Sequence, residues 1–473
     1  MIVTFLIFAL TFILFLLGVL FYLAPRSKNV TTIPGLDPSD DISGNIDDIT
    51  AAGSFHEFLV DLHDKFGPVA SFWYGPKYCI SVASAPAFKD VQHLTDRPAV
   101  LFDFLEPLLG PRSIQIATGT LGMERHKRSI DALSHQVSSV VFPQFIQITK
   151  ELCDAWKSFS ANEHIPLHEY MMALSIRMIS TTQFGAFFRK NPDNIKALAS
   201  LYHEVMKGMD DILTGKLTPA DTEKYGEFQG KIDAFKSLVR QIILSHKTAR
   251  DNGDYEVAPL LDSLLDHTED EDQLLGDVIA FFVGGFHTTG NLLTWLFYYL
   301  AMMPDIQEKA FNEIVANVGQ SCDLQAEEVH KLQFCSQVID ETLRMSITAP
   351  FGARVNSSAE MTVLGHRIPQ ATPIITALGV SLRDKKYFPD PEEFDPNRFG
   401  KKVPSLAFAP FGIGKRHCPA SKFARMEIFA VLSVILAQFR VKPAFDNDVF
   451  IEPSFGFVTK PETEVWLTLE RRN

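Results

Sequence analysis

The chain has 473 residues, a formal net charge of −13 and 46% hydrophobic residues. The acidic balance and the lack of a basic tract argue against a nucleic-acid partner. Five cysteines, at positions 79, 153, 322, 335 and 418, show no paired spacing, which argues against a disulfide-stabilised scaffold and fits a reducing compartment.

The N-terminal residues 2–23 carry no charge and are mostly Leu, Ile, Phe and Val. A run of roughly 20 apolar residues is long enough to cross a bilayer. It lacks the basic start and small-residue end of a cleaved signal peptide, and it is not the Arg-rich amphipathic helix of a mitochondrial address. Because Arg26 and Lys28 follow directly, the positive-inside rule predicts a cytosolic body behind a membrane anchor.

The rest of the chain is predicted to be one mostly helical unit. Strands at 69–74 and 78–82 around Gly75-Pro76 indicate a hairpin. Apolar periodicity predicts helices at 85–94, 149–159, 175–187, 232–247, 274–300, 306–318 and 423–439, and short strands are expected near 361–364 and 464–468. No linker, repeat or low-complexity tract divides this unit. The predicted fold class is therefore mainly α with small β-sheets.

The most informative segment precedes the last predicted helix and reads Phe411-Gly412-Ile413-Gly414-Lys415-Arg416-His417-Cys418-Pro419-Ala420. Gly412 and Gly414 allow a tight loop, and Pro419 fits a first helical turn. A thiol just before a helix meets unpaired N–H groups and the positive end of the dipole, which predicts a lowered pKa and a thiolate ligand. Haem iron with Cys418 as axial ligand is the economical interpretation. A buried free cysteine in a Gly-rich turn is the alternative.

Phe411, Gly414, Arg416 and Cys418 stand at the spacing Phe-x-x-Gly-x-Arg-x-Cys-x-Gly, with Ala420 at the last position. In this loop the chain resembles the cytochromes P450. The resemblance implies a single large haem domain of the P450 fold with haem b, iron protoporphyrin IX, as cofactor. Phe411 and Gly412 would line the cofactor, and Arg416 would reach a haem propionate. The implied domains are a signal-anchor helix at 1–24, a Pro-containing linker at 25–50 and the catalytic domain at 51–473.

Glu341 and Arg344 lie three apart on a predicted helix and can pair on one face. Alone, such a pair is typical of solvated surfaces, where it contributes little. In the cytochromes P450 the pair is buried and is joined by an arginine from a downstream Pro-rich loop, which implies a structural triad with Arg398. Between them, Arg354 matches the arginine that reaches a propionate.

Residues 281–289 lie inside a long apolar helix, and Gly284 and Thr288 are four apart on one face. Close helix packing is one interpretation. The resemblance implies instead an oxygen-activating segment, with Thr288 and Thr289 as its threonines. At the position where that segment usually carries an acidic residue, this chain has His287. An imidazole can also relay protons because its ordinary pKa lies near 6.5, but it is expected to do so less well than the usual carboxylate. Slowed or altered oxygen activation is therefore predicted.

Upstream, Met123 and Lys127 occupy the region of the family's Trp-x-x-x-Arg pattern. Lys127 would then supply charge to a propionate, although an ammonium lacks the bidentate fork of arginine. The alternative is a solvated basic face.

A basic group surrounds the Cys loop and consists of Lys401, Lys402, Lys415, Arg416, Lys422 and Arg425. Such a face would attract an acidic electron donor, unless it is a plain solvated charge run. The resemblance implies NADPH–cytochrome P450 reductase as the donor, with cytochrome b5 as a second candidate. The 39 phenylalanines include several where the family lines its substrate pocket, which fits an apolar substrate: Phe102, Phe104, Phe281, Phe282, Phe351 and Phe455.

Residues 53–73, with 33–35 and 44–45, resemble family 20, subfamily A of the superfamily. The expected function is a monooxygenase of the endoplasmic reticulum membrane that inserts one oxygen atom of O₂ into an apolar lipid, sterol or xenobiotic. Two alternatives are an isomerase or dehydratase that acts on a peroxide, and a non-catalytic haem-binding protein.

Overall fold

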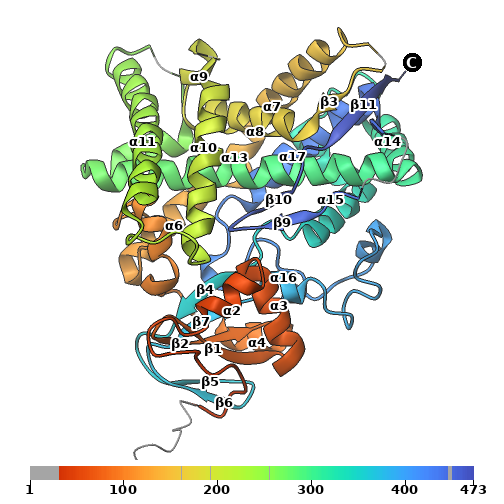
Figure 1. The fold of residues 1–473 in the computed structure, drawn as a ribbon. Helices are drawn as coiled ribbons and strands as arrows, with labels where there is room; N and C mark the ends of the chain where they lie inside the picture. Colours follow the sequence, from red (N-terminus) through yellow and green to blue (C-terminus); the bar gives the residue numbers. More distant parts are fainter. Residues whose placement is uncertain (1–30, 161, 192, 255, 446–449, 473) are drawn as a thin grey trace, which may run out of the picture.

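The computed structural model describes residues 31–160, 162–191, 193–254, 256–445 and 450–472. Helices make up most of the molecule, and a small β-rich lobe lies at one end, at the bottom of Figure 1. One long helix, α13 (Glu271–Met302), crosses the whole body. The fold is therefore mainly α with small sheets, as the sequence predicted.

The sequence around α13 explains its length. Asp270 caps the helix by accepting hydrogen bonds from the backbone N–H groups of Asp272 and Gln273, and acidic residues in the first turn favour the positive end of the dipole. The helix ends at Met302, two residues before Pro304. It is apolar nearly all round and correspondingly buried. The helix α8 (Leu167–Gln183) packs along it.

The remaining helices surround this pair, and α7 packs against α17 beneath the Cys loop. Their bounds are α2 (Ile46–Ala51), α3 (Phe55–Phe66), α4 (Ala85–Val91), α5 (Glu106–Leu109), α6 (Gly119–Ala132), α7 (His135–Trp156), α9 (Phe187–Lys190), α10 (Asp193–Leu213), α11 (Thr222–Asp251), α12 (Pro259–His267), α14 (Pro304–Val318), α15 (Gln333–Ser346), α16 (Leu378–Ser381) and α17 (Ser421–Gln438). Short 3₁₀ turns are η1 (Ala99–Leu101), η2 (Asp103–Leu105), η3 (Ala326–Lys331), η4 (Pro396–Gly400) and η5 (Gly414–Arg416).

The β-rich lobe holds a four-stranded sheet in the order β1-β2-β7-β4 and a two-stranded sheet of β5 and β6. Two further small sheets have the orders β3-β11-β8 and β10-β9. The strands are β1 (Val69–Tyr74), β2 (Lys77–Val82), β3 (Ile165–Pro166), β4 (Gly352–Val355), β5 (Met361–Val363), β6 (His366–Ile368), β7 (Pro373–Thr376), β8 (Phe439–Pro443), β9 (Pro453–Phe455), β10 (Thr459–Pro461) and β11 (Trp466–Arg471). The predicted hairpin is β1 and β2, which turn at Gly75-Pro76.

The predicted anchor at 1–24 lies outside the described residues. Within the described ranges, no helix combines the length and apolar composition that a bilayer crossing requires. Residues 31–50, predicted as part of a linker, pack on the lobe instead. Ile33 and Ile49 are buried, and Gly35 and Gly44 bridge to β1.

Candidate haem site

The Cys loop has the tight backbone that its glycines predict. The Cys418 N–H donates to the Phe411 carbonyl at 2.8 Å and closes the loop. Gly412 and Gly414 have φ of 82° and 68°, in the left-handed region. A Cβ added at Gly414 would lie 1.8 Å from the Gln92 carbonyl oxygen. The loop therefore presses directly onto the end of α4, and only glycine fits there.

Burial raises the pKa of the Cys418 thiol to about 11, and the Ala420 N–H offsets this only in part. The prediction that the helix end alone lowers this pKa is therefore wrong, because desolvation of the thiolate outweighs the dipole. A thiolate at this place needs a cation beside the sulfur. A bound iron would provide that charge and replace the proton.

Three arginines converge near the loop, and Asp96 is the acidic group whose charge acts on one of them, Arg416. Arg354 Nη2 donates to the Arg416 carbonyl at 3.1 Å. Arg416 Nη2 donates to the Ile114 carbonyl, whereas its Nε and Nη1 are buried without a partner among the described residues. Arg97 is half-buried, and its Nε is buried without a partner within the same described ranges.

Burial lowers the pKa of all three guanidinium groups, that of Arg354 to about 10. Repulsion from neighbouring arginines adds to this, although at Arg416 the repelling group is Arg125 and Asp96 partly opposes it. Unpaired donors and excess positive charge require an anionic ligand. The two propionates of a haem have this chemistry, so the residues present fit the group that Cys418 implies. Arg97 was not recognised from the sequence, since it lies in an irregular segment between Asp96 and Pro98 where no periodicity marks burial.

Helix α6 presents Arg125 and His126 to the interior, and Lys127 is exposed. His126 Nε2 donates to the His417 carbonyl at 2.9 Å, directly beside Cys418. The structure thus does not bring Lys127 to the loop as predicted, because the inward helical face falls one and two residues earlier. We therefore replace Lys127 by Arg97 as a candidate propionate ligand.

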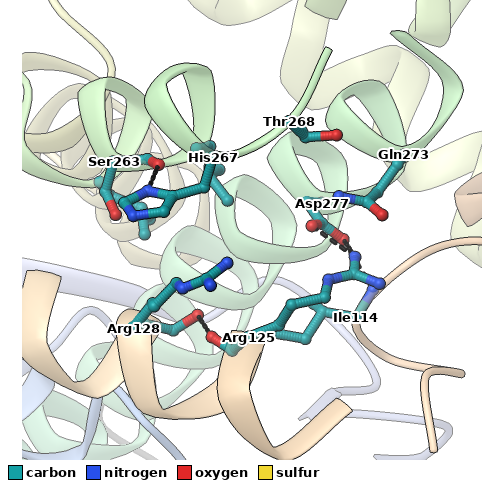
Figure 2. Close-up of a pocket in the computed structure, with 11 residues that line it drawn as sticks. Ile114, Arg125, Arg128, Ser263, His267, Thr268, Gln273 and Asp277 are labelled. Atoms are coloured by element: carbon teal, nitrogen blue, oxygen red, sulfur yellow. Dashed lines mark hydrogen bonds and ion pairs between the residues drawn. The ribbon is translucent and has the colours of Figure 1, made fainter. Parts of the chain in front are cut away.

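Arg125 fixes α6 to the first half of α13. Its Nη2 donates to both carboxylate oxygens of Asp277 at 2.5 Å, and Figure 2 shows the pair at one wall of a small cavity. That cavity, of about 30 Å³, lies between α6, α12 and α13 and is also lined by Arg128, His267 and Thr268. Its size suits a single water molecule and excludes an organic substrate.

The structure brings the predicted proximal triad together. Arg344 donates through Nε and Nη2 to the two oxygens of Glu341 at 2.8 and 2.9 Å, and Arg398 Nε donates to Oε1 at 2.9 Å. Glu341 and Arg344 are fully buried, and the side chain of Arg398 is 11% exposed. Arg344 and Arg398 also donate to backbone carbonyls of residues 382–393. The triad therefore ties α15 to the segment that leads into the Cys loop.

On α13 the two adjacent glycines differ. A Cβ at Gly284 would touch nothing within 4 Å, whereas one at Gly285 would lie 2.6 Å from Ile179 Cγ1. The Thr288 hydroxyl donates to the Gly284 carbonyl at 2.6 Å and so borders the same open space. Thr289 is buried. This face of α13 has room for a ligand beside a hydroxyl.

His287 points away from that face toward α10, where its Nδ1 lies 2.6 Å from Tyr202 Oη. Burial lowers the pKa of His287 to about 3, and nearby cationic groups add to the effect. The pKa of His287 thus lies well below the ordinary value near 6.5, and the ring is neutral at physiological pH.

Of the phenylalanines predicted to line the pocket, one belongs to the core and others lie at partly buried places or near the β9–β10 turn. Phe282 is fully buried and packs against Phe184 and Phe188, which makes it a core residue. By contrast, Phe281 is partly buried and shares the face of Gly284. Phe104 and Phe351 both meet Phe457, whose backbone joins β9 to β10. Phe455 packs on His56.

A family model described as Cytochrome P450 matches residues 34–467. The chain belongs to the cytochrome P450 family. It is 32% identical over 475 residues to Cytochrome P450 20A1 of Rattus norvegicus, covering 99% of both chains. It is 30% identical over 475 residues to Cytochrome P450 20A1 of Homo sapiens, again covering 99% of both. Cytochrome P450 4V2 of Homo sapiens is 34% identical over 232 residues, 45% of this chain and 42% of that protein. The resemblance to family 20, subfamily A is thus confirmed along the full length.

Proposed function

We propose that this cytochrome P450 is a haem-thiolate monooxygenase for an apolar organic substrate. The observation that carries the proposal is the convergence of Cys418, in a glycine-shaped loop, with three arginines, two of which have buried donors without a partner among the described residues. When bound, haem b would supply dioxygen activation and the insertion of one oxygen atom, with the other leaving as water.

The chain's own residues have distinct parts in this proposal. Arg97, Arg354 and Arg416 bind the propionates, while Phe411 and Gly412 shape the loop that presents Cys418. On α13, Gly284 leaves room for a ligand.

The Thr288 hydroxyl, now bonded to the Gly284 carbonyl, is placed to exchange that bond for one to a ligand. Thr289 and His287 flank it and complete the proposed catalytic set. Glu341, Arg344 and Arg398 hold the proximal scaffold, which is a structural role.

Electrons would come from NADPH through cytochrome P450 reductase, with cytochrome b5 as a second donor. Support comes from the exposed lysines near the loop, namely Lys401, Lys402, Lys415 and Lys422. Arg416 and Arg425 do not belong to the exposed basic face that was predicted, because Arg416 is buried and Arg425 pairs with Asp340. We also propose a single-pass anchor in the endoplasmic reticulum membrane, with the catalytic domain cytosolic, on the apolar composition of residues 2–23.

The first test is the carbon monoxide difference spectrum of the reduced protein expressed without residues 1–28. A band typical of thiolate-ligated haem supports Cys418 as the axial ligand. Its absence from folded, haem-loaded protein contradicts the proposal and favours a non-catalytic haem-binding protein.

The second test is NADPH consumption with reductase in a screen of apolar compounds. Product formation that depends on NADPH supports the monooxygenase. Turnover of a lipid hydroperoxide without reductase would favour the isomerase or dehydratase, to which a weak proton supply is suited.

A further inference from the structure

Tyr202 of α10 and His287 of α13 form a hydrogen-bonded pair that lies apart from the Cys loop. Tyr202 Oη and His287 Nδ1 are 2.6 Å apart, and both side chains are buried. Their rings meet edge to face, with centroids 4.9 Å apart. The pair links α10 to the residue directly before Thr288.

The surroundings of His287 disfavour a charged ring. The titratable groups that act on it come from three elements and are His168 of α8, His203 of α10 and Lys460 of β10. All three oppose a positive charge on His287, and burial acts in the same direction. The nearest acidic influence, from Asp210 of α10, acts on Tyr202 and raises its pKa further above the ordinary value. Both partners of the hydrogen bond are therefore neutral.

The chemistry of the two groups fixes the direction of the bond. A phenol is a better donor than a neutral imidazole N–H, and an imidazole nitrogen is a better acceptor than a phenol oxygen. Tyr202 accordingly donates to Nδ1. The proton of the neutral ring then resides on Nε2, since the bond made by one nitrogen sets the state of the other.

The backbone of His287 is held as well. Asn291 Nδ2 donates to the His287 carbonyl at 2.8 Å, and Asn291 Oδ1 accepts from His168 Nε2 at 3.1 Å. The hydroxyl of the next residue, Thr288, donates to the carbonyl of Gly284, which lies one turn earlier in the helix. The ring is thus restrained by Tyr202 of α10 and the carbonyl by Asn291 of α13, which His168 of α8 contacts in turn, so His287 has little freedom to turn.

We propose that Tyr202 is a positioning residue, which holds the ring of His287, the residue before Thr288, turned toward α10 with its proton on Nε2. This inference rests on the proposed monooxygenase function and deepens it. A position that usually offers an ionisable carboxylate here offers a fixed hydrogen bond. The state of this pair, and with it any effect on proton supply through the neighbouring Thr288, is then the same from pH 6 to pH 8, because neither Tyr202 nor His287 titrates there.

Tyr202→Phe tests the proposal, since it keeps the ring that packs on Phe286 at 4.7 Å and removes only the hydroxyl. The matched control is Tyr298→Phe on the same α13, whose hydroxyl accepts from the Ile451 N–H at 3.2 Å. Two quantities are measured in haem-loaded protein. They are the histidine ¹⁵N chemical shifts, with His287→Asn to assign the signal, and the hydrogen peroxide released per NADPH with reductase at pH 6, 7 and 8.

We expect a single Nε2–H form of His287 in the wild type and a mixture of tautomers in Tyr202→Phe. The peroxide share should rise about fivefold, the factor that corresponds to one hydrogen bond. It should be constant with pH in the wild type and unchanged in Tyr298→Phe. The proposal is overturned if Tyr202→Phe keeps the wild-type tautomer, or if its peroxide share matches that of the control.

The shift measurement needs no turnover. A wild-type protein without the thiolate carbon monoxide band would overturn the proposed function, while the ¹⁵N shifts would still decide the role of Tyr202.

Discussion

Gly414→Ala is predicted to disable the Cys loop through two separate costs. Gly414 has φ of 68°, and a left-handed conformation costs a non-glycine residue roughly 1–2 kcal/mol. The new Cβ would also lie 1.8 Å from the Gln92 carbonyl oxygen and 2.7 Å from its carbon. Because these are backbone atoms, the loop or the end of α4 must move, at a further cost of about 1–3 kcal/mol.

The sum for Gly414→Ala is about 2–5 kcal/mol, and it falls on the segment that presents Cys418. The expected result is a reduced fraction of haem with the thiolate carbon monoxide band and a lower urea concentration for haem release. Both quantities are measured on protein reconstituted with excess haem.

Gly412→Ala is the matched control for this experiment. Gly412 has φ of 82°, but its added Cβ would find only His417 Cα, at 3.8 Å. It should therefore cost only the conformational part, roughly 1–2 kcal/mol. Equal effects of the two variants would refute the close approach to Gln92 as the reason for glycine at 414.

Three further predictions concern other parts of the site. Gly284→Ala should leave the free energy of unfolding unchanged or raise it by up to about 1 kcal/mol, and it should alter the optical shifts that apolar ligands cause. Gly285→Ala, whose new Cβ would lie 2.6 Å from Ile179, should lower the free energy of unfolding measured in urea. The reverse order of the two variants would contradict the assignment of the open face. Glu341→Gln should cost about 3–5 kcal/mol, because it leaves Arg344 and Arg398 without their carboxylate, and haem release at wild-type urea concentration would argue against a supporting triad. His56→Phe should flatten the pH dependence of stability. Burial lowers the pKa of His56 to about 3, so below pH 6.5 the unfolded chain binds a proton more readily than the folded chain. For this group the free energy of unfolding therefore falls by about 1.4 kcal/mol for each unit by which the pH is lowered. Urea midpoints at pH 6.5, 5.5 and 4.5 measure that slope, and an unchanged slope would show that His56 is not the group responsible.

Local spacing predicted the parts of the site that depend on neighbours in sequence. Gly412, Gly414 and Cys418 lie within one turn-forming segment, and Glu341 and Arg344 share a helical face, so their geometry follows from residue type and interval. The long apolar helix was found for the same reason, since its periodicity extends over many turns.

What the sequence left open depends on contacts between distant segments. The pKa of Cys418 is governed by burial, which no local pattern reports. The ring of His287 turns toward Tyr202, which is 85 residues away in the chain. Arg97 gains its place only when the loop after α4 meets β4 and the Cys loop, and on α6 the choice between Arg125 and Lys127 depends on which helical face packs inward.

The three clustered arginines, Arg97, Arg354 and Arg416, also bear on when the cofactor can be captured during synthesis. They come from the first quarter of the chain, from β4 and from the Cys loop, and Arg416 already bonds to a carbonyl 302 residues earlier. A chain still emerging from the ribosome has its early cationic segment but neither Arg416 nor Cys418. The complete set of cations and the thiol therefore forms only after nearly the whole polypeptide has been released, so the full site for a haem does not exist before then.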